Sequence, residues 1–422
     1  MFSIPFFKVL YDINIVMVTL LSVCYFNQAL YMVLSIFLRK KRWKATDVRH
    51  RYAFVIPARN EESVIAGLLD SIRAQNYPKE LISVIVIADN CTDRTAAIAA
   101  EKGAIVIERF NPNERTKGYA LRYAAQQIMA DERFRDVEGF FIFDADNLLH
   151  PDYLLEMNKA FDSGCRVVTG YRTTKNFADN WLSANSSLMY LREARHIHYC
   201  RASLGFGTYV SGTGYVVDRE HFAQIAQRPF RTLTEDVELS AILAAAGEKI
   251  YDCPEAVFYD EQPTRFRDFV LQRLRWCKGN HQVFATQGKN LTLSLLRKPS
   301  FTKWGMWVHI LPLPAITFIW FVLYLLLGLT WALVRGIPFD ILMAECLSYS
   351  LINFAYPFVL GILCGLLLFI QCYKELNAGF WTKIKHALLF PVGMYLLFPI
   401  TVAALFVRVE WKTTRHNIQS NS

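Results

Sequence analysis

The chain has 422 residues, 53% of them hydrophobic, and a formal net charge of +9. A length of this kind accommodates one large domain or two ordinary ones. The basic residues cluster beside apolar runs, which disfavours a nucleic-acid-binding protein and favours contact with anionic lipid. Nine cysteines without a C-x-x-C pair predict neither a zinc site nor a disulfide framework, and they suit a reducing compartment. His196, His198 and His281 lack metal-ligand spacing, and we expect structural roles for them.

Four apolar runs divide the chain. The first, at 12–38, is long enough to cross a bilayer and lacks a cleavage site, so we expect an anchor rather than a removed leader. Three more runs lie near the other end, at 306–334, 348–371 and 386–407. Between about 44 and 300 the composition is that of a soluble α/β domain. The sequence therefore predicts a membrane protein with one soluble domain inserted between its membrane segments.

A dense basic cluster, "RKKRWKATDVRHR", follows the first apolar run. By the positive-inside rule it predicts a cytoplasmic soluble domain and an external N-terminus, in a multi-pass protein of the cell membrane. Three later crossings would leave the basic tail "VRVEWKTTRHN" outside, against that rule. Either the last run is re-entrant or one apolar run forms a hairpin. Pro391 and Pro399 point to the last run, but Pro312 and Pro314 interrupt another, and the number of crossings stays open.

The soluble stretch alternates strands with helices. Strands are expected at "YAFVIPARN", "LISVIVIADN", "AIVIER" and "GFFIFDADN", and helices at about 61–75, 91–103 and 117–130. This alternation predicts a parallel sheet with crossover helices, which binds ligands beyond the carboxyl ends of its strands. Neither G-x-G-x-x-G nor the P-loop pattern is present, so both ordinary nucleotide signatures are absent.

Acidic residues follow several of these strands, and carboxylates are unfavourable in a hydrophobic core. Carboxylates that face one crevice are costly unless a cation or hydrogen-bond donors occupy it. In "FDADN", Asp144 and Asp146 would project from one side of an extended backbone and hold a hard divalent ion; a solvated turn is the alternative. Asp89 is either a turn residue or an acceptor for a nucleobase N–H or ribose hydroxyl. The first strand is followed by Arg59, Asn60 and Glu61.

Two further motifs carry candidate charges for a reaction. Lys117 and Gly118, in "TKGYAL", suit either a solvated lysine or a cation at a nucleotide, with the glycine permitting close approach. In "TLTED", Asp236 is a candidate general base for a sugar hydroxyl that attacks an activated anomeric carbon. The alternative is a helix start, with Thr234 as N-cap and Glu235 in the first turn, and both interpretations can hold together.

The run "RFRDFVLQRLRW" predicts an amphipathic helix at a membrane interface. Arg275 offers a planar donor fork for a departing diphosphate, and Trp276 offers a flat face for a sugar ring. Gln272, one turn earlier, would share that face. The loop "SGTG", which contains Ser211 and Gly212, is either an ordinary turn before a strand or a gap through which an acceptor approaches the donor.

In their order, "IPARNE", "IADNCTDRT", "TKGYAL", "FDADN", "SGTG", "TED" and "QRLRW" resemble the processive membrane-embedded branch of glycosyltransferase family 2, the cellulose, chitin, hyaluronan and poly-N-acetylglucosamine synthases. The resemblance covers about 50–290 by motif. It implies an α/β fold, with a cytoplasmic GT-A-type nucleotide-sugar domain inserted between α-helical transmembrane segments. The expected boundaries are 1–43 for the anchor, 44–262 for the GT-A domain, 263–303 for interfacial helices and 304–422 for the C-terminal membrane region and tail.

The same resemblance implies an inverting single displacement from a UDP-sugar donor, with Mg²⁺ or Mn²⁺ as cofactor. Asp89 would match the uridine-contacting acid, and Glu61 and Lys117 the flanking nucleotide contacts. Asp144 and Asp146 would match the donor and metal pair. The sequence departs from many relatives after Asp89, where "DNCTDRT" stands in place of a second Asp and a Gly, and this leaves the nucleotide preference open.

On the acceptor side, the resemblance implies that Asp236 is the general base, beside Glu235. Gln272 and Arg275 would close over the diphosphate, and Trp276 would stack on the acceptor sugar. Ser211 and Gly212 would line the acceptor's approach, and the membrane helices would form a channel for the growing chain. Because the chain lacks a long C-terminal domain of the cyclic-dinucleotide type, we expect no regulation of that kind within it.

The leading hypothesis is a synthase that polymerises a hexose or N-acetylhexosamine from a UDP-sugar and exports the polysaccharide through its own transmembrane channel. Its partners would be the donor, the growing glycan and membrane lipid. The alternative is a non-processive membrane glycosyltransferase that makes a glycolipid, and the length of the product separates the two. A non-catalytic membrane scaffold is a third hypothesis, which the intact set of acids disfavours.

Overall fold

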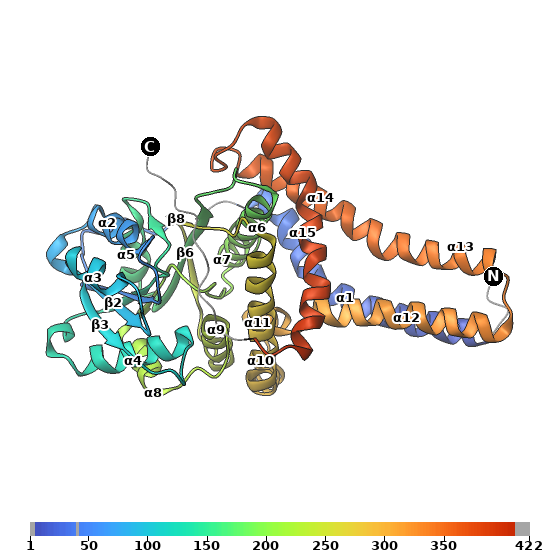
Figure 1. The fold of residues 1–422 in the computed structure, drawn as a ribbon, viewed down its shortest axis with the longest axis horizontal. Helices are drawn as coiled ribbons and strands as arrows, with labels where there is room; N and C mark the ends of the chain where they lie inside the picture. Colours follow the sequence, from blue (N-terminus) through green and yellow to red (C-terminus); the bar gives the residue numbers. More distant parts are fainter. Residues whose placement is uncertain (1–4, 39–41, 410–422) are drawn as a thin grey trace.

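The computed structural model describes residues 5–38 and 42–409, and Figure 1 shows an α/β domain from which long helices project. The basic residues 39–41 and the tail beyond 409 lie outside the described residues. The strands are β1 (Tyr52–Ala58), β2 (Ile82–Asp89), β3 (Ile105–Arg109), β4 (Gly139–Ile142), β5 (Leu148–Leu149), β6 (Val167–Thr174), β7 (Tyr215–Asp218) and β8 (Tyr251–Asp260). The helices of the α/β domain are α2 (Ile65–Arg73), α3 (Thr95–Glu101), α4 (Lys117–Ala130), α5 (Tyr153–Asp162), α6 (Trp181–Arg192), the π-helix η3 (Glu193–His198), α7 (Tyr199–Ser203), α8 (Arg219–Gln227) and α9 (Glu235–Ala246). The remaining helices are α1 (Pro5–Phe37), α10 (Phe266–Arg297), α11 (Phe301–Ile310), α12 (Leu313–Arg335), α13 (Phe339–Ser350), the π-helix η4 (Leu351–Ala355), α14 (Tyr356–Gln371) and α15 (Phe380–Phe406).

One mixed sheet forms the centre of the domain, with the strand order β3-β2-β1-β4-β7-β6-β8-β5. The strands β3, β2, β1 and β4 run parallel, so that Val55 pairs with Ile85 on one side and with Ile142 on the other. β7 is antiparallel to both of its neighbours, β4 and β6. The predicted parallel sheet is therefore confirmed for its first four strands, and β7 reverses the direction beyond them.

Helices cover both faces of the sheet because its central strands are apolar on both sides. Along β1, Phe54 packs with residues of α2, α3 and α5 on one face. Its neighbour Val55 packs with residues of α4, α8 and α9 on the other face. This arrangement leaves the carboxyl ends of the parallel strands uncovered by crossover helices, at the edge that faces α10 (Figure 1).

The loops after β1 and β2 are longer than the sequence suggests. The predicted helix 117–130 coincides with α4, but α2 and α3 each begin four residues later than expected. Asn60 (φ 56°) and Asn90 (φ 52°) adopt the left-handed conformation that asparagine tolerates. The Thr92 backbone N–H donates to Asn60 Oδ1 at 2.8 Å, so the two loops hold each other in place at the strand ends.

The prediction of an extended backbone through "FDADN" is wrong. β4 ends at Ile142, and the Asn147 N–H donates to the Asp144 carbonyl at 3.2 Å, which closes a turn. The Asp144 N–H instead donates to the Thr213 hydroxyl at 2.8 Å. The Thr213 hydroxyl, from the loop before β7, thus replaces a neighbouring strand as the acceptor for the Asp144 N–H. The chain bends at this point.

Three long helical segments project side by side from the domain: α1, α12 and the continuous helix from α13 through η4 to α14 (Figure 1). They meet at Asn14, whose Oδ1 accepts hydrogen bonds from Trp320 Nε1 at 2.9 Å and from Tyr349 OH at 3.5 Å. Lys8–Phe37 and Leu313–Arg335 are long and apolar enough to cross a membrane. The axis of the bundle is therefore occupied by side chains at this level.

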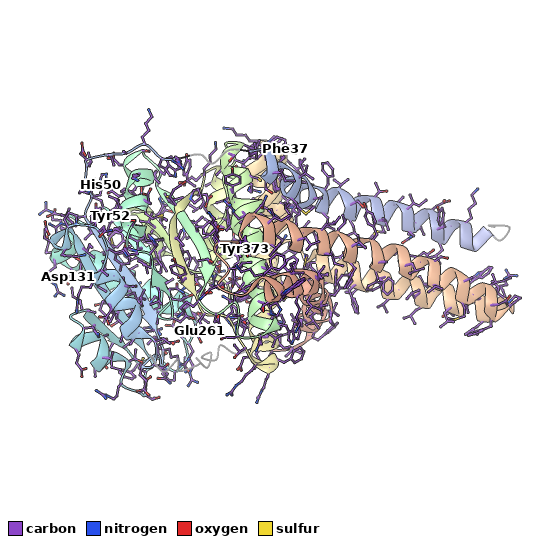
Figure 2. All side chains as sticks on the ribbon, turned by 90° about the horizontal axis from the view of Figure 1, so that it is seen from above. Phe37, His50, Tyr52, Asp131, Glu261 and Tyr373 are labelled. Atoms are coloured by element: carbon purple, nitrogen blue, oxygen red, sulfur yellow. The ribbon has the colours of Figure 1, made fainter. Side chains whose placement is uncertain are left out.

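The outer surface of the projecting helices is apolar and uncovered. Figure 2 shows their side chains pointing away from the bundle with no other part of the chain beside them. Leu20 is 58% exposed, Phe26 63% and Val359 52%. Contiguous apolar surface of this extent marks a contact with a membrane or a partner.

The last apolar run forms α15, which is also long and apolar enough to span a membrane. It nevertheless lies crosswise at the base of the projecting helices (Figure 1). Its Thr401 Oγ1 lies 3.2 Å from His281 Nε2 of α10, and its Phe390 carbonyl accepts a hydrogen bond from Asn185 Nδ2 of α6 at 2.9 Å. These contacts hold α15 against the α/β domain, so it does not run alongside α1 and α12.

Candidate active site

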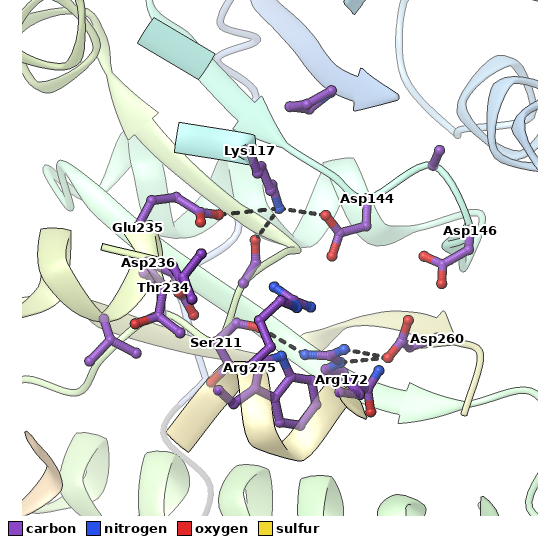
Figure 3. Close-up of a pocket in the computed structure, with 18 of the residues that line it drawn as sticks. Lys117, Asp144, Asp146, Arg172, Ser211, Thr234, Glu235, Asp236, Asp260 and Arg275 are labelled. Carbon is purple, nitrogen blue, oxygen red and sulfur yellow. Dashed lines mark hydrogen bonds and ion pairs between the residues drawn. The ribbon is translucent and has the colours of Figure 1, made fainter. Parts of the chain in front are cut away.

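A cavity of about 270 Å³ opens beyond the carboxyl ends of the parallel strands, between the α/β domain and α10 (Figure 3). Residues from β-strand ends, loops and several helices meet there although they lie far apart in the sequence. The cavity is lined by every site residue predicted from the sequence: Glu61, Asp89, Lys117, Asp144, Asp146, Ser211, Gly212, Glu235, Asp236, Gln272, Arg275 and Trp276. The structure brings the set together, and the individual roles stay predictions.

Lys117 is the central cation of the cavity (Figure 3). Its Nζ lies 2.5 Å from Asp144 Oδ1, 2.7 Å from the Gly212 carbonyl and 3.7 Å from Glu235 Oε1. Burial alone would lower the pKa of Lys117, but the Asp144 and Glu235 carboxylates outweigh burial and raise it. The lysine is therefore charged, and it joins the D-x-D turn, the SGTG loop and the TED helix.

The glycine after this lysine serves protein packing. A Cβ at Gly118 would come within 2.8 Å of Phe230 Cβ and 3.3 Å of Glu235 Cβ. The absence of that carbon lets the start of α4 approach the start of α9. The close approach predicted at this glycine therefore occurs between two helices, and it brings Lys117 within reach of Glu235.

The two acids of the TED motif lie at the start of α9, where Glu235 is buried and Asp236 is half-buried. Burial raises the pKa of Glu235 to about 7, with Lys117 opposing and Asp236 adding to the shift. Burial also raises the pKa of Asp236, and Lys117 again opposes it. Raised carboxyl pKa values near the working pH are typical of groups that exchange protons during a reaction.

We expect an acid limb in the pH profile of the reaction because a general base must be unprotonated. Because burial raises the pKa of both carboxyl groups, kcat/KM should begin to fall at a higher pH than the ordinary range of a carboxylic acid allows. Glu235→Gln removes one negative neighbour of Asp236, which should lower the Asp236 pKa and move the limb to lower pH. An unchanged limb in this variant would contradict the proximity of the two acids. The measurement is initial rate against pH for both proteins.

A hydrogen-bond chain supports the D-x-D turn from behind. The Thr213 hydroxyl donates to Asn147 Oδ1 at 2.5 Å, and Asn147 Nδ2 donates to Asp260 Oδ1 at 2.9 Å. Asp260 in turn accepts from Arg172 Nε at 3.0 Å, and Arg172 Nη1 donates to the Ser211 carbonyl at 2.7 Å. Sequence reasoning missed Arg172, Asn147 and Asp260. This series of hydrogen bonds fixes the D-x-D turn relative to the SGTG loop.

Asp89 at the end of β2 is buried and ion-paired. Arg109 Nη1 donates to its Oδ1 at 2.6 Å, and the two residues are register partners in β2 and β3. The same arginine lies 2.6 Å from Glu114 through its Nη2. The turn-residue interpretation is therefore insufficient, because this carboxylate is held by a dedicated cation at the edge of the cavity.

The start of α9 lies directly beneath α10. Thr234 occupies the N-cap position of α9, as predicted, but its side chain makes no capping hydrogen bond. A Cβ at Gly279 would come within 2.9 Å of Thr234 Cβ and closer still to the other Thr234 side-chain atoms. Gly279 therefore permits the contact that brings Gln272, Arg275 and Trp276 over the TED acids.

The Q-x-x-R-W residues on α10 face the same cavity, as their spacing predicts. Gln272 Oε1 is buried without a protein hydrogen bond in the described part of the chain, which suits a group that receives a ligand. Arg273 holds its guanidinium carbon 4.2 Å from the centre of the Trp276 ring. One face of the indole is thus covered by protein, and a sugar would have to stack on the uncovered part of the ring.

The structure adds cavity residues on the side toward α6 and α11 that no motif identified: Tyr190, Glu193, Tyr209, Asn280 and His309. His196 and His281 bond to residues of α14 and α15, in keeping with the structural roles expected of them. His198 differs, since its Nε2 lies 3.1 Å from Glu193 Oε1. The cluster Glu-x-x-x-x-His at 193–198 is the one sequence signal that could have pointed to this side.

The residues present fit a divalent metal ion that is shared with a ligand. Within the described residues, no group of three His, Cys, Asp or Glu side chains is arranged to hold a metal by itself. Asp144 and Asp146 do line the same cavity, and Asp144 is 37% exposed. Two carboxylates can hold a hard divalent ion when phosphate oxygens and water complete its shell.

Comparison with known proteins identifies the family. The pattern described as "Glycosyltransferase like family 2" matches residues 50–279, more than half of the chain. "Probable glycosyltransferase YdaM" of Bacillus subtilis (strain 168) is 24% identical over 248 residues, which are 55% of this chain and 56% of that protein. "4,4'-diaponeurosporenoate glycosyltransferase" of Staphylococcus aureus is 33% identical over 163 residues, 36% of this chain and 41% of that protein. The chain thus spans about half the length of these curated relatives, or less.

A solved structure shares the fold. The mannosyltransferase PcManGT from Pyrobaculum calidifontis, in complex with GDP-Man and Mn²⁺, matches with a TM-score of 0.54 and 19% identity, over 90% of this chain and 97% of that one. This likeness confirms the predicted α/β fold of GT-A type. Because the family pattern covers more than half of its residues, the chain belongs to the glycosyltransferase-like family 2.

Proposed function

We propose that this chain transfers a sugar from a UDP-sugar to a hydroxyl group, with inversion at the anomeric carbon. One observation carries the proposal: a half-buried acid with a raised pKa, Asp236, faces the same cavity as the D-x-D acids and the cations Lys117 and Arg275. A base for the acceptor proton and cations for the leaving diphosphate are what a direct displacement requires.

The step balances within the cavity. The acceptor oxygen forms a bond to the anomeric carbon while the bond from that carbon to the diphosphate oxygen breaks. The acceptor proton moves to Asp236, and the electron pair of the broken bond leaves with the diphosphate. Arg275 and Gln272 stabilise the charge that develops on the leaving group, and Asp89 receives a hydrogen bond from the uridine.

We propose Mg²⁺ or Mn²⁺ as the cofactor, held by Asp144 and Asp146 together with the diphosphate. Such an ion supplies positive charge to the leaving group. The ion pair with Lys117 orients the Asp144 carboxylate, and the Asn147–Asp260 hydrogen bond at 2.9 Å fixes the far end of the turn. The residues of the chain therefore position the donor before any chemistry takes place.

The projecting helices fit a bilayer, with the α/β domain on the cytoplasmic side of the cell membrane. The exposed apolar surface of α1, α12 and α14 supports this location. α15, with its contacts to α6 and α10, would then lie along the membrane surface on the catalytic side. This arrangement gives three crossings and keeps the basic tail on the cytoplasmic side, in agreement with the positive-inside rule.

The bundle favours a membrane-bound acceptor that receives a single sugar. Trp320 and Tyr349 both reach Asn14, so side chains fill the axis between the three helices of one chain. Helices packed at ~8–10 Å between axes enclose no lumen wide enough for a sugar polymer. Export of a polysaccharide by this chain would need further helices, from other copies or partners, and polymerisation of a hexose or N-acetylhexosamine is the second candidate.

The test is UDP release by the purified, detergent-solubilised chain across a panel of UDP-sugars with Mg²⁺ or Mn²⁺, followed by sizing of the product. Release with one donor and a product carrying a single added sugar is expected. A high-mass glycan would move the assignment to a polysaccharide synthase. No release with any UDP-sugar would overturn the proposed transfer from a UDP-sugar donor.

A further inference from the structure

One side of the cavity presents polar groups that the protein leaves unused. The phenol oxygens of Tyr190 and Tyr209, the ring nitrogens of His309 and the amide of Asn280 all belong to cavity-lining residues. Within residues 5–38 and 42–409, none of these groups makes a hydrogen bond to the protein, and none is shut off from solvent. They come from α6, α10, α11 and the loop before β7, and together they form an uncommitted hydrogen-bonding surface.

Glu193 supplies the only carboxylate among this described group of side chains. Its Oε1 lies 3.1 Å from His198 Nε2 and also accepts the Ser211 hydroxyl hydrogen bond. Its Oε2 has no hydrogen bond to the described protein and remains available to a ligand. Burial would raise the pKa of Glu193, but the hydrogen bonds from His198 and Ser211 dominate and hold that pKa at about 2.

Two basic residues, His309 and Arg172, line the cavity beside this surface. Burial lowers the pKa of His309 to about 4, against the opposing influence of Glu193, so this imidazole is neutral at physiological pH. Its ring stacks on Tyr209, with 4.0 Å between the ring centres. Arg172 lies 3.7 Å over the Tyr190 ring, but its guanidinium is already bonded to Asp260 and to the Ser211 carbonyl. The Glu193 carboxylate therefore lies among aromatic rings, beside a neutral imidazole and a guanidinium that is already bonded to other partners.

The groups on this surface favour one chemical class of ligand. Aromatic faces and mixed donors and acceptors suit a ring that carries hydroxyl groups, because each hydroxyl can both donate and accept. A free carboxylate oxygen is a strong acceptor for such a hydroxyl. A phosphate or carboxylate on the ligand would meet Glu193 as a like charge at short range, which is strongly unfavourable in a buried site.

We propose that Tyr190, Glu193, Tyr209, Asn280 and His309 form the acceptor subsite, and that Glu193 selects a neutral hydroxylated ring, such as a sugar or polyol head group, against an anionic acceptor. This inference rests on the proposed transferase function. Glu193 acts here as a specificity-determining residue, since its charge decides which acceptor remains bound long enough to react.

The experiment compares two acceptors that differ by one charge. Octyl β-glucoside and octyl β-glucuronide share the ring and the tail, but the second carries a carboxylate. The full chain, kept in a detergent without sugar groups, is assayed with its preferred UDP-sugar, and kcat/KM is measured for each acceptor. We expect a preference for the glucoside of at least ~10-fold. Glu193→Gln should reduce this ratio toward one and raise the KM for the glucoside. Glu101→Gln, an exposed acid on α3, is the matched control and should leave both values unchanged.

The acceptor ratio is independent of how much of a variant is folded, so partial misfolding of Glu193→Gln does not obscure the result. Equal use of the two acceptors by the unaltered chain would overturn the inference, as would an unchanged ratio in Glu193→Gln. UDP release in the presence of either of the two acceptors reports the transferase function separately. Its absence would refute the proposed function, whereas its presence with no acceptor preference would refute the subsite alone.

Discussion

An Asp236→Asn variant should lose sugar transfer by ~10²–10⁴-fold, the contribution typical of a positioned general base. The amide has nearly the same shape but cannot accept the acceptor's proton at neutral pH. Asp236 faces the SGTG loop, since its Oδ2 is the nearest atom to the position that a Cβ on Gly212 would take, at 3.8 Å. The variant should therefore keep the cavity intact while its chemistry fails.

Stability is expected to remain at least as high in Asp236→Asn as in the unaltered chain. Burial raises the pKa of Asp236, which means that the folded protein holds the ionised form at a cost. A neutral amide removes that cost. Transfer rate and thermal unfolding are measured together, with Glu101→Gln as a control that changes an exposed acid. Retention of more than a tenth of the activity in a folded Asp236→Asn protein would exclude Asp236 as the base.

The sequence predicts the residues at strand ends well because local patterns determine them. Asp89, Asp144 and Asp146 each follow a continuous apolar strand, and parallel strands must bring their carboxyl ends to one edge. The Q-x-x-R-W residues likewise follow from helical spacing on α10. In these cases one secondary-structure element, read alone, identifies the sheet edge or the helix face on which the residue lies.

Tertiary contacts determine what the sequence could not predict. The bend at Asp144 depends on a hydroxyl from Thr213, which lies 69 positions further along the chain. The partner of Asp89 is Arg109, and their pairing becomes visible only in the register of β2 against β3. Glu193 and His309 reach the cavity from elements that carry no motif. Glu193 begins η3, and the π-helical geometry of η3 changes which of its side chains share one face.

The arrangement of the apolar runs also depends on tertiary contacts that the sequence does not reveal. Composition identifies 12–38 and 386–407 as equally apolar, and both form helices long enough to span a membrane. The two differ in their contacts, because α15 is bonded to Asn185 and lies beside His281, whereas α1 projects with most of its surface uncovered. Such packing depends on residues elsewhere in the chain, so hydropathy alone leaves the number of crossings open.

A Gly279→Ala variant should reduce transfer by ~10²-fold, because a misplacement of about 1 Å at reacting groups has effects of this size. The added methyl group would overlap the Thr234 side chain, which is packed directly beneath α10. α10 can relieve the overlap by moving away from α9, and this movement carries Gln272 and Arg275 away from the leaving group. Weaker UDP binding, measured by calorimetry, should accompany the lower rate.

Gly288→Ala is the matched control for this variant. It replaces another glycine of α10, so both changes raise helix propensity by about 1 kcal/mol. A Cβ at Gly288 would lie 3.1 Å from the Phe284 ring of the same helix, a side chain that can adjust. We expect near-normal transfer in Gly288→Ala, which would attribute the Gly279→Ala defect to the contact with α9 rather than to the helix itself.

A second substitution distinguishes a steric clash from a general loss of structure. Thr234→Gly removes all the side-chain atoms that the Gly279→Ala methyl group would overlap, and because Thr234 makes no capping hydrogen bond, the start of α9 should tolerate the change. The double variant should therefore recover most of the transfer and UDP binding lost in Gly279→Ala, giving a coupling between the two sites that independent positions do not show. If the losses instead add, α10 is held over the TED acids by contacts other than this one, and Gly279 does not set its position.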